Sequence, residues 1–509
     1  MTKNTHEFDL YQKLLDKYKD IVVLNNIYNH IYWDLDTYMP EKGTEQRSEE
    51  FAMMSGLLHE RITDSEVGSL LDQIKEHEKY QKLPAAEKRN IHLIKKEYDR
   101  ETKVPKELVK AIAKQSAIAN EIWKKAKKES NYELFKPELI KIFDLIKKRA
   151  QYINPDLDPY DVLLDLGEPG ITREKLDELF SELRDGLIPL IKAITDSPNK
   201  PDYSLIQRDC PKDIQEKISQ DAALAAKYDL TSGRIDETVH PFTTGFYDDV
   251  RITTHYTLDD FSSSFFAVLH EAGHALYEQN MLKEYKYQPV GFYCSDGFHE
   301  SQSRFIENVI GRSKEFWEYY LPKLKEITGD IFADVDLEPF VLAINRVIPS
   351  KIRVEADPVT YSMHVIVRHE IEKDLFAGNI SFDDLPKIWN EKMKEYLGVT
   401  IENDAEGLLQ DVHWSGGGFG TFPGYAIGNI IDGQLLWKIE QDIPKWRDQV
   451  RKGNLSDVVD WLIKNVHQKG NLYDPLDLIK EITGEELSTK YYLDYLHRTF
   501  SKIYGLKES

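Results

Sequence analysis

Cysteine is scarce in this sequence, and long apolar runs are missing. Two cysteines, Cys210 and Cys294, occur among 509 residues, so a disulfide framework is not expected and a reducing compartment is. No run of 18 or more apolar residues is present, which argues against a helix that crosses a membrane. These absences predict a cytoplasmic protein without a membrane partner.

Positive charge is also in short supply. Lysine and arginine number 66 against 88 aspartates and glutamates, which gives a formal net charge of −22. Proteins that bind nucleic acids need clustered basic residues to displace counterions from phosphates, so no nucleic-acid partner is expected. The hydrophobic fraction of 41% and the charged fraction of 30% are ordinary for a soluble globular protein.

Helical periodicity, in contrast, runs through most of the chain. Tyr11, Leu14, Tyr18 and Val22 follow one another at three- and four-residue steps and would form one apolar stripe. The same spacing returns in later segments, residues 106–128, 137–153, 172–194, 444–466 and 489–506. The pattern predicts a mainly α-helical protein, with breaks at Pro- and Gly-rich stretches and no internal repeat.

One segment, residues 249–257, alternates instead. DVRITTHYT sets Val250 and Ile252 against Arg251 and Thr253, a period of two that is rich in β-branched residues. We therefore predict a strand just before the next helix. A strand beside a metal-binding helix suits a peptidase, because an edge strand can pair with an extended peptide.

The helix that follows contains the sequence HEAGH. Its start is predicted at the preceding TLDD, which has the T-x-x-D form of a helix cap. His270 and His274 are four residues apart, share one helix face and can both reach one ion. Glu271 is turned by about 100° from His270, where it can act as a base toward water without being a ligand. The pattern indicates a catalytic metal centre; the alternative is a pair of surface histidines.

Two histidines leave a catalytic metal short of a ligand, which must come from downstream. The long motif HExxHxxGxxH is absent, because Tyr277 and Asn280 stand where it requires Gly and His. A second predicted helix, residues 297–313, offers Glu300 and Glu307, seven residues apart on one face. Spacing alone favours Glu300 but leaves Glu307 open.

Six short motifs occur in order along the chain: HPF (240–242), DVRIT (249–253), HEAGH (270–274), HESQ (299–302), IRVEAD (352–357) and GLLQDVHW (407–414). Together they resemble the carboxypeptidase Taq family of zinc metallocarboxypeptidases. Two further stretches, 32–47 and 419–435, extend the likeness over nearly the whole chain. Pro358, Thr421 and Gly424 depart from the family pattern, and none of them belongs to the metal set.

The resemblance implies a mainly α-helical gluzincin fold, built as a single body around a deep active-site cleft, with a small β-sheet near the metal helix. It implies one catalytic domain over residues 1–509. Helices of about 1–200 would form one cleft wall, about 201–435 would carry the motifs, and 436–509 would add C-terminal helices. A homodimer and one divalent ion per chain, zinc first and cobalt second, are also implied.

The metal set follows from the resemblance residue by residue. It implies His270, His274 and Glu300 as the ligands and Glu271 as the general base. The resemblance therefore favours Glu300 over Glu307 as the third ligand, a choice that the spacing alone left open.

Arg353, in IRVEAD, would bind the terminal carboxylate of the substrate, because the planar fork of an arginine can bind both carboxylate oxygens. The motif by itself equally fits a helix-surface arginine paired with Glu355 or Asp357. The resemblance favours the carboxylate-binding role.

Three more residues have predicted roles. His413 and Tyr425 would donate hydrogen bonds to the oxyanion that forms when water attacks the carbonyl; the alternative is that each is a buried structural residue. His240 would contact substrate or fix the cleft wall. Asp249 and Arg251 are expected to pair with each other and hold the end of the strand.

The sequence thus predicts a metal-dependent carboxypeptidase that releases single amino acids from peptides with a free C-terminus. One alternative is a zinc oligopeptidase or dipeptidyl-carboxypeptidase that cuts further from the C-terminus. A non-enzymatic alternative is a peptide-binding zinc scaffold. Glu271 argues against the scaffold, because a structural zinc site has no use for a base.

Overall fold

A computed structural model describes residues 9–506 of the chain. The chain folds as two compact units, each assembled from three stretches. The first unit contains the residues up to Lys103, Cys210–Cys294 and Leu455–Tyr473; the second contains Val104–Asp209, Ser295–Asn454 and the residues from Asp474 onward. The resemblance implies one catalytic domain with three parts, and this organisation stays a prediction.

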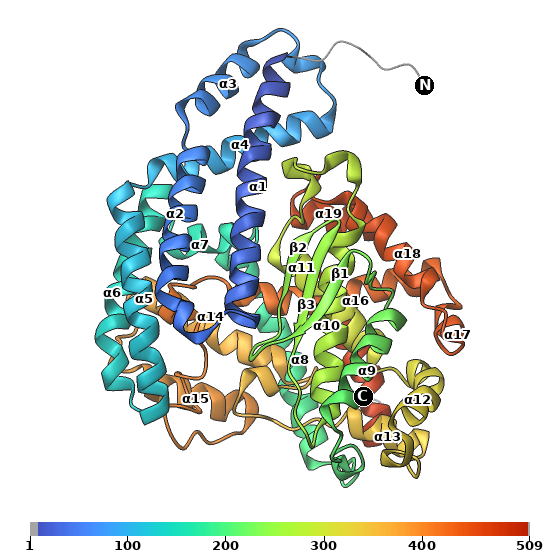
Figure 1. The fold of residues 1–509 in the computed structure, drawn as a ribbon. Coiled ribbons are helices and arrows are strands. Elements are labelled where there is room, and N and C mark those ends of the chain that lie inside the picture. The colour runs from blue at the N-terminus through green and yellow to red at the C-terminus, as the bar shows by residue number, and fades with distance from the viewer. Residues whose placement is uncertain (1–8, 507–509) are drawn as a thin grey trace, which may run out of the picture. The chain divides into compact units, whose positions relative to one another are not determined.

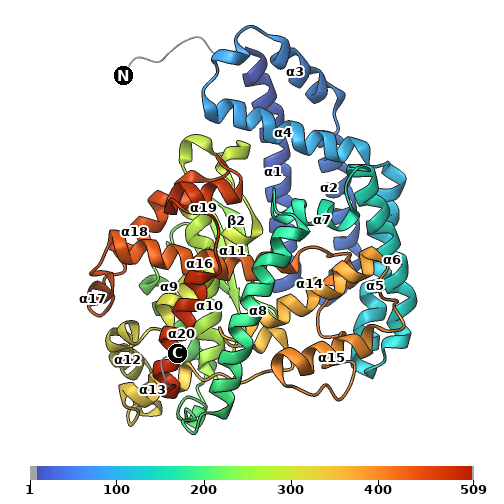
Figure 2. The ribbon, with the colours of Figure 1, turned by 180° about the vertical axis from the view of Figure 1, so that it is seen from behind.

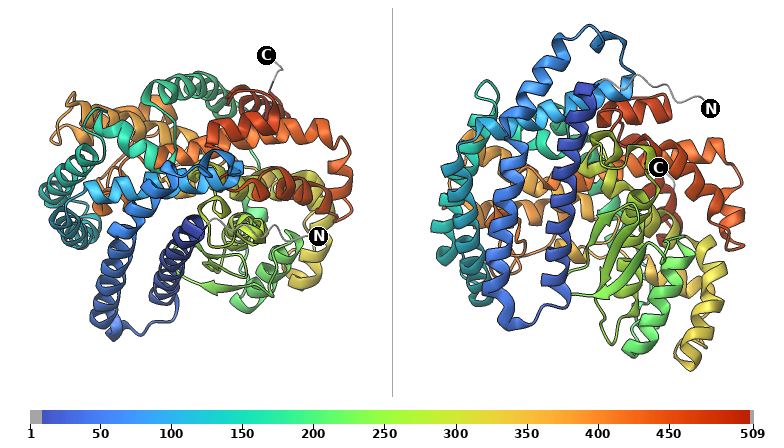
Figure 3. Two further views of the ribbon diagram at one scale, coloured as in Figure 1. Left: turned by 90° about the horizontal axis from the view of Figure 1, so that it is seen from above. Right: turned by 45° about the horizontal axis from the view of Figure 1, so that its top comes forward.

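The first unit joins helices to a small sheet. Helices α1 (Asp9–Thr37) and α2 (Thr44–Ile62) run side by side as a hairpin (Figure 3), with the rings of Tyr28 and Phe51 in contact at 5.0 Å. The other helices of this unit are α3 (Ser65–Glu76), α4 (Ala85–Lys103), α9 (Lys212–Ala225), α10 (Phe261–Asn280) and α18 (Ser456–Asn465).

The sheet of the first unit has three strands in the order β1-β3-β2. Strand β3 (Asp249–Thr254) is the one predicted from the alternating pattern, and it ends three residues earlier than expected. Strand β1 (Gly233–Glu237) pairs with it in parallel and β2 (Thr243–Phe246) pairs with it antiparallel. The predicted strand is therefore central. The two edge strands were not predicted, because GRIDE is charged and TTGF contains glycine, both weak strand signals.

Helix α10, which carries HEAGH, lies against β2 and β3 (Figure 1). Its N-cap is Asp260, whose side chain accepts a hydrogen bond from the backbone N–H of Ser262 at 3.0 Å. The helix therefore begins after Asp260, and the predicted cap at Thr257 is wrong. The sheet and the buried face of α10 together make a rigid platform for the two histidines.

Trp33, near the end of α1, ties this helix to the sheet. The guanidinium groups of Arg234 on β1 and Arg251 on β3 lie 5.0 and 4.4 Å from the ring centroid of the buried indole. The Nε and Nη2 atoms of Arg251 both donate to Asp249 at 2.9 Å, so the pairing expected within DVRIT is present. His30 of α1 contacts the same carboxylate at 3.1 Å.

The second unit is built from helices. Among them, α16 and α20 pack side by side (Figure 2). Its helices are α5 (Lys106–Glu129), α6 (Tyr132–Ile153), α7 (Pro159–Gly167), α8 (Arg173–Asp196), α11 (Asp296–Arg304), α12 (Lys314–Thr328), α13 (Leu337–Ile344), α14 (Tyr361–Ala377), α15 (Leu385–Leu397), α16 (Phe422–Asp442), α17 (Trp446–Val450), α19 (Pro475–Thr483) and α20 (Lys490–Tyr504).

The fold class predicted from the sequence, mainly α-helical with a small sheet near the metal helix, is confirmed. All five later segments with helical spacing lie largely in helices of the described chain. Over residues 9–506, no helix combines the length and the apolar character that crossing a membrane would require.

Glycine permits the close packing of α16 on α20. A Cβ atom placed on Gly433 would lie 2.3 Å from the Cα and 2.4 Å from the backbone nitrogen of Tyr492. Both contacts are with backbone, which cannot rotate away as a side chain can. Any larger residue at position 433 must therefore push the two helices apart.

We expect Gly433→Ala to lower the free energy of unfolding by about 1–3 kcal/mol, the usual cost of overpacking a core. The matched control is Gly56→Ala in α2, where a Cβ would meet no atom within 4 Å. Because alanine favours helix, that control should be neutral or stabilising by up to about 1 kcal/mol. Chemical denaturation of both variants measures the two effects; equal stability of the variants would contradict the contact.

Candidate metal centre and active site

Helix α10 presents two imidazoles on one face. His270 and His274 are one helical turn apart, and their ring centroids lie 5.0 Å from each other. The helix around them is buried along Phe265, Leu269 and Leu276. The apolar stripe that predicted the helix thus also fixes the direction in which both rings point.

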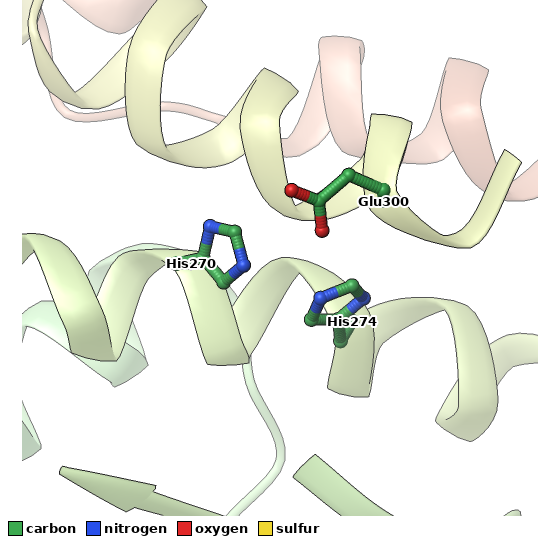
Figure 4. A group of neighbouring side chains, drawn as sticks. All are labelled: His270, His274 and Glu300. Atoms are coloured by element: carbon green, nitrogen blue, oxygen red, sulfur yellow. The ribbon is translucent and has the colours of Figure 1, made fainter. Parts of the chain in front are cut away.

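Glu300, on α11, completes a group of three donors. Figure 4 shows its carboxylate and the two imidazoles pointing into the same space. One donor atom from each of His270, His274 and Glu300 lies within 4.8 Å of the other two. Zinc binds such donors at about 2.0–2.2 Å, so three donor atoms this close to one another could share one ion. Two imidazoles and one carboxylate are also a donor set that catalytic zinc takes, so these residues fit a divalent ion.

Glu307, the competing candidate, lies outside this group. Helix α11 ends at Arg304, and Phe305–Gly311 form a π-helix, whose wider turn breaks the 3.6-residue repeat. The Glu307 carboxylate lies 3.2 Å from Nη2 of Arg312 and 3.7 Å from Nη1 of Arg304. The seven-residue spacing therefore does not give the shared face that a regular α-helix would.

Arg304 holds the Glu300 carboxylate. Its Nε donates to Oε1 at 2.7 Å, and its guanidinium stacks 3.9 Å from the ring centroid of Tyr361. The side chains of Arg304 and Glu300 are 12% and 7% exposed, so solvent screens their attraction little. The hydroxyl of Ser303 lies 3.1 Å from Oε2. Arg304 and Ser303 thus fix the orientation of the Glu300 carboxylate.

Glycines on α16 allow that helix to approach Glu300 closely. A Cβ on Gly428 would lie 2.9 Å from Cγ of Glu300 and 3.1 Å from the carbonyl oxygen of Gly297. A Cβ on Gly424 would lie 3.1 Å from Oε1 of Glu168. Gly424, one of the departures from the family pattern, therefore belongs to the same close contact with α11.

Glu271 follows His270 on α10 and is buried, with 5% of its surface exposed. Thr243, the first residue of β2, donates its hydroxyl proton to Oε2 of Glu271 at 2.6 Å. The same hydroxyl lies 3.1 Å from the Glu271 carbonyl oxygen. The carboxylate of the predicted base is therefore held on one side by the edge of the sheet.

His240, predicted to contact substrate, lies exposed on the loop between β1 and β2. Two residues later, the Phe242 ring packs against Tyr32 with centroids 5.6 Å apart. The backbone N–H of Phe242 also donates to the Thr253 hydroxyl at 2.8 Å. The HPF motif thus anchors the start of β2 through its phenylalanine and leaves its histidine accessible.

Arg353 is buried, with 7% of its surface exposed. Its Nε donates to Oδ1 of Asp411 at 3.0 Å, and its Nη1 donates to the hydroxyl of Tyr361 at 2.9 Å. The alternative pairing with Glu355 or Asp357 is therefore not formed. Its Nη2 lies 3.0 Å from the same Asp411 oxygen, and an arginine has five N–H groups. Part of the guanidinium fork thus stays available to a ligand.

Asp411 bridges two buried arginines. Its Oδ1 accepts from Arg353, and its Oδ2 accepts from Nε of Arg368 at 2.7 Å. Burial alone would raise the pKa of the Asp411 carboxyl, but Arg368 and Arg353 hold that pKa well below its ordinary value. Burial raises the pKa of Glu372, which also interacts with Arg368, to about 7. Arg353 and Arg368 therefore share the carboxylate of Asp411.

His413 and Tyr425 form a pair, with Nε2 of His413 3.3 Å from the Tyr425 hydroxyl. Burial and the charge of Arg353 lower the pKa of His413 to about 4, so this imidazole is neutral at pH 7. Burial also raises the pKa of Tyr425 well above its usual value, so its hydroxyl keeps the proton. The Arg353 guanidinium lies 5.2 Å from the Tyr425 ring centroid. The structure thus brings three of the predicted residues together in one cluster.

Three residues of the site were not predicted: Thr243, Arg304 and Asp411. Arg304 had a local signal, since it stands four residues after Glu300, the spacing of a helical ion pair. Asp411 lies inside GLLQDVHW, but only the fold shows that its partner is Arg353, 58 residues earlier. Thr243 had no signal, because its contact with Glu271 spans 28 residues.

Comparison with known proteins gives one consistent result. A family model described as carboxypeptidase Taq (M32) metallopeptidase matches residues 13–500. The chain is 41% identical over 500 residues to carboxypeptidase 1 of Bacillus subtilis, covering 98% of each chain. It is 37% identical over 505 residues to thermostable carboxypeptidase 1 of Thermus thermophilus, covering 97% of this chain and 99% of that one. The crystal structure of an M32 carboxypeptidase from Deinococcus radiodurans R1 matches with a TM-score of 0.94 at 32% identity, covering 98% and 100% of the two chains.

A substitution at a neighbouring residue that displaces the Glu300 side chain should weaken metal binding. We expect Gly428→Ala to push the Glu300 side chain away and to lower the affinity for Zn²⁺ about 10- to 100-fold, the usual effect of disturbing groups that orient a ligand. Competition with a chromophoric chelator measures the affinity. Gly433→Ala, on the same helix but against Tyr492, is the control that should bind Zn²⁺ normally while folded. Equal affinities of the two variants would show that this contact does not position Glu300.

Proposed function

This chain belongs to the carboxypeptidase Taq (M32) family and is a metallocarboxypeptidase; from this premise we propose that it releases amino acids one at a time from the free C-terminus of peptides. The observation that carries the proposal is the buried pair of arginines, Arg353 and Arg368, which share the single carboxylate of Asp411. An uncompensated buried charge is costly. A substrate carboxylate at this position would balance it.

The metal of this metallopeptidase would be held by His270, His274 and Glu300, whose donor atoms lie within 4.8 Å of one another. We propose zinc as the ion, with cobalt as the alternative, because two imidazoles and a carboxylate form a set that catalytic zinc commonly takes. When bound, such an ion polarises the scissile carbonyl and makes water more acidic. Arg304 supports this assignment by fixing the orientation of Glu300.

Glu271 is the proposed general base. It follows a proposed ligand directly on α10, and its carboxylate is buried among fixed partners. In this role it accepts a proton from the attacking water and passes it to the leaving amine.

Arg353 is proposed to bind the terminal carboxylate of the peptide. Asp411 orients its Nε edge, and Tyr361 accepts from Nη1. These contacts fix the plane of the guanidinium while leaving N–H groups on the Nη atoms for the substrate. Binding of both carboxylate oxygens by a planar guanidinium is a strong, directional interaction.

His413 and Tyr425 are proposed to stabilise the oxyanion. With the proton of neutral His413 on Nε2, this nitrogen donates to the tyrosine oxygen. The Tyr425 hydroxyl then has its own proton free to donate to the developing oxyanion. His240, exposed on the loop before β2, is proposed to contact the peptide chain.

The two alternative functions are not favoured. The relatives that match over nearly the full length are carboxypeptidases by name, which argues against an oligopeptidase and against a binding scaffold. From the resemblance we further propose one catalytic domain and a homodimer. We also propose a cytoplasmic location, which the two buried free cysteines support.

The function is tested with one peptide in two forms, the free acid and the C-terminal amide, followed by mass spectrometry. We expect a ladder of one-residue losses from the free acid and none from the amide. A chelator should stop the reaction, and added Zn²⁺ should restore it. Glu271→Gln, with one metal per chain, should not produce the ladder. Losses of two residues at a time, or equal cleavage of the amide, would refute the proposal.

Replacing Arg353 tests the carboxylate site separately. Arg353→Gln removes up to two charge-assisted hydrogen bonds to the substrate, each worth about 1.5–3 kcal/mol, so kcat/KM for the free acid should fall at least 100-fold. The loss should appear mainly in KM. The control is Lys351→Gln, which removes an equal charge from the same segment but pairs with Glu406. If Arg353→Gln still prefers the free acid as strongly as the unmodified enzyme does, Arg353 is not the carboxylate site.

A further inference from the structure

We infer that Thr243 is a positioning residue for the general base: its hydroxyl holds one oxygen of the Glu271 carboxylate and thereby fixes the orientation of that carboxylate. The inference rests on the proposed function, because it gives Glu271 the role of base. The observation behind it is the 2.6 Å hydrogen bond from Thr243 Oγ1 to Glu271 Oε2.

The hydroxyl has one proton and two acceptors within reach. It lies 2.6 Å from Oε2 of Glu271 and 3.1 Å from the carbonyl oxygen of the same residue. A hydrogen bond to an ionised carboxylate is shorter and stronger than one to a neutral carbonyl. The shorter distance therefore identifies the carboxylate as the acceptor.

Thr243 itself is fixed by the sheet. It is the first residue of β2 and pairs with Ile252 of β3, whose side chain is buried. The carbonyl oxygen of the preceding residue, Phe242, accepts from the backbone N–H of Thr253, and the backbone N–H of Phe242 donates to the Thr253 hydroxyl. A β-branched side chain on such a strand also has few rotamers. The hydroxyl therefore has a defined position relative to α10, against which β2 packs.

A defined donor matters because a glutamate side chain is flexible. Ordering such a side chain costs rotamer entropy. A base that is already oriented does not meet this cost during the reaction, which is how positioning groups raise kcat. The hydrogen bond from Thr243 to Oε2 therefore provides part of that orientation before the substrate binds.

The test is Thr243→Val, which has nearly the same shape without the hydroxyl. We expect kcat to fall about 10- to 30-fold, with KM changed less than twofold. Thr243→Ser keeps a hydroxyl and should recover most of kcat. Zn²⁺ affinity, measured by chelator competition without substrate, should be the same in all variants.

The matched control is Thr244→Val, the same change on the next residue of β2. Successive side chains of a strand point to opposite faces, so this variant should keep the kcat of the unmodified enzyme. An unchanged kcat in Thr243→Val would overturn the inference. So would a Thr243→Ser enzyme as slow as Thr243→Val, or a loss of Zn²⁺ affinity that accounts for the slower rate. Full activity of Glu271→Gln would instead overturn the proposed function, so the two failures are distinguishable.

Discussion

The buried ion pair between Arg304 and Glu300 is the interaction on which the rest of the candidate site depends. It fixes one oxygen of the Glu300 carboxylate, which forms the group of candidate metal ligands together with His270 and His274. Arg304 also stacks on Tyr361, and the hydroxyl of Tyr361 accepts from Arg353. One continuous set of contacts therefore connects a proposed metal ligand with the proposed carboxylate-binding arginine. Two side chains, Arg304 and Tyr361, link the two ends.

Such a set of charges is tolerated in the interior only because nearly all of it is compensated. Arg304 pairs with Glu300, while burial and the Glu300 charge raise the pKa of neighbouring Asp432 well above its ordinary value. The exception is the pair of arginines bridged by Asp411. Two guanidinium groups that share one carboxylate are an arrangement that attracts a further anion.

Features that depend on residues close together in the sequence could be predicted. Contacts between residues far apart in the sequence could not. The helical stripes, the strand at DVRIT and the shared face of His270 and His274 depend on neighbours within four residues, so the sequence displays them directly. The choice between Glu300 and Glu307 depended on the helix type after Arg304, and no simple pattern predicts a π-helix. The partner of Arg353 lies 58 residues away, on another element. Short-range periodicity has no information about such a pair.

The small sheet of this largely helical enzyme supports a side chain of the candidate site. A helix can present His270 and His274 on one face, but the residue between them in the motif, Glu271, is turned by about 100° and needs its own support. Strand β2 supplies that support through Thr243, and β2 is in turn paired with β3. Trp33, held between Arg234 and Arg251, joins α1 to the same sheet. The strands therefore support the proposed base, as the ion pair with Arg304 supports the proposed ligand.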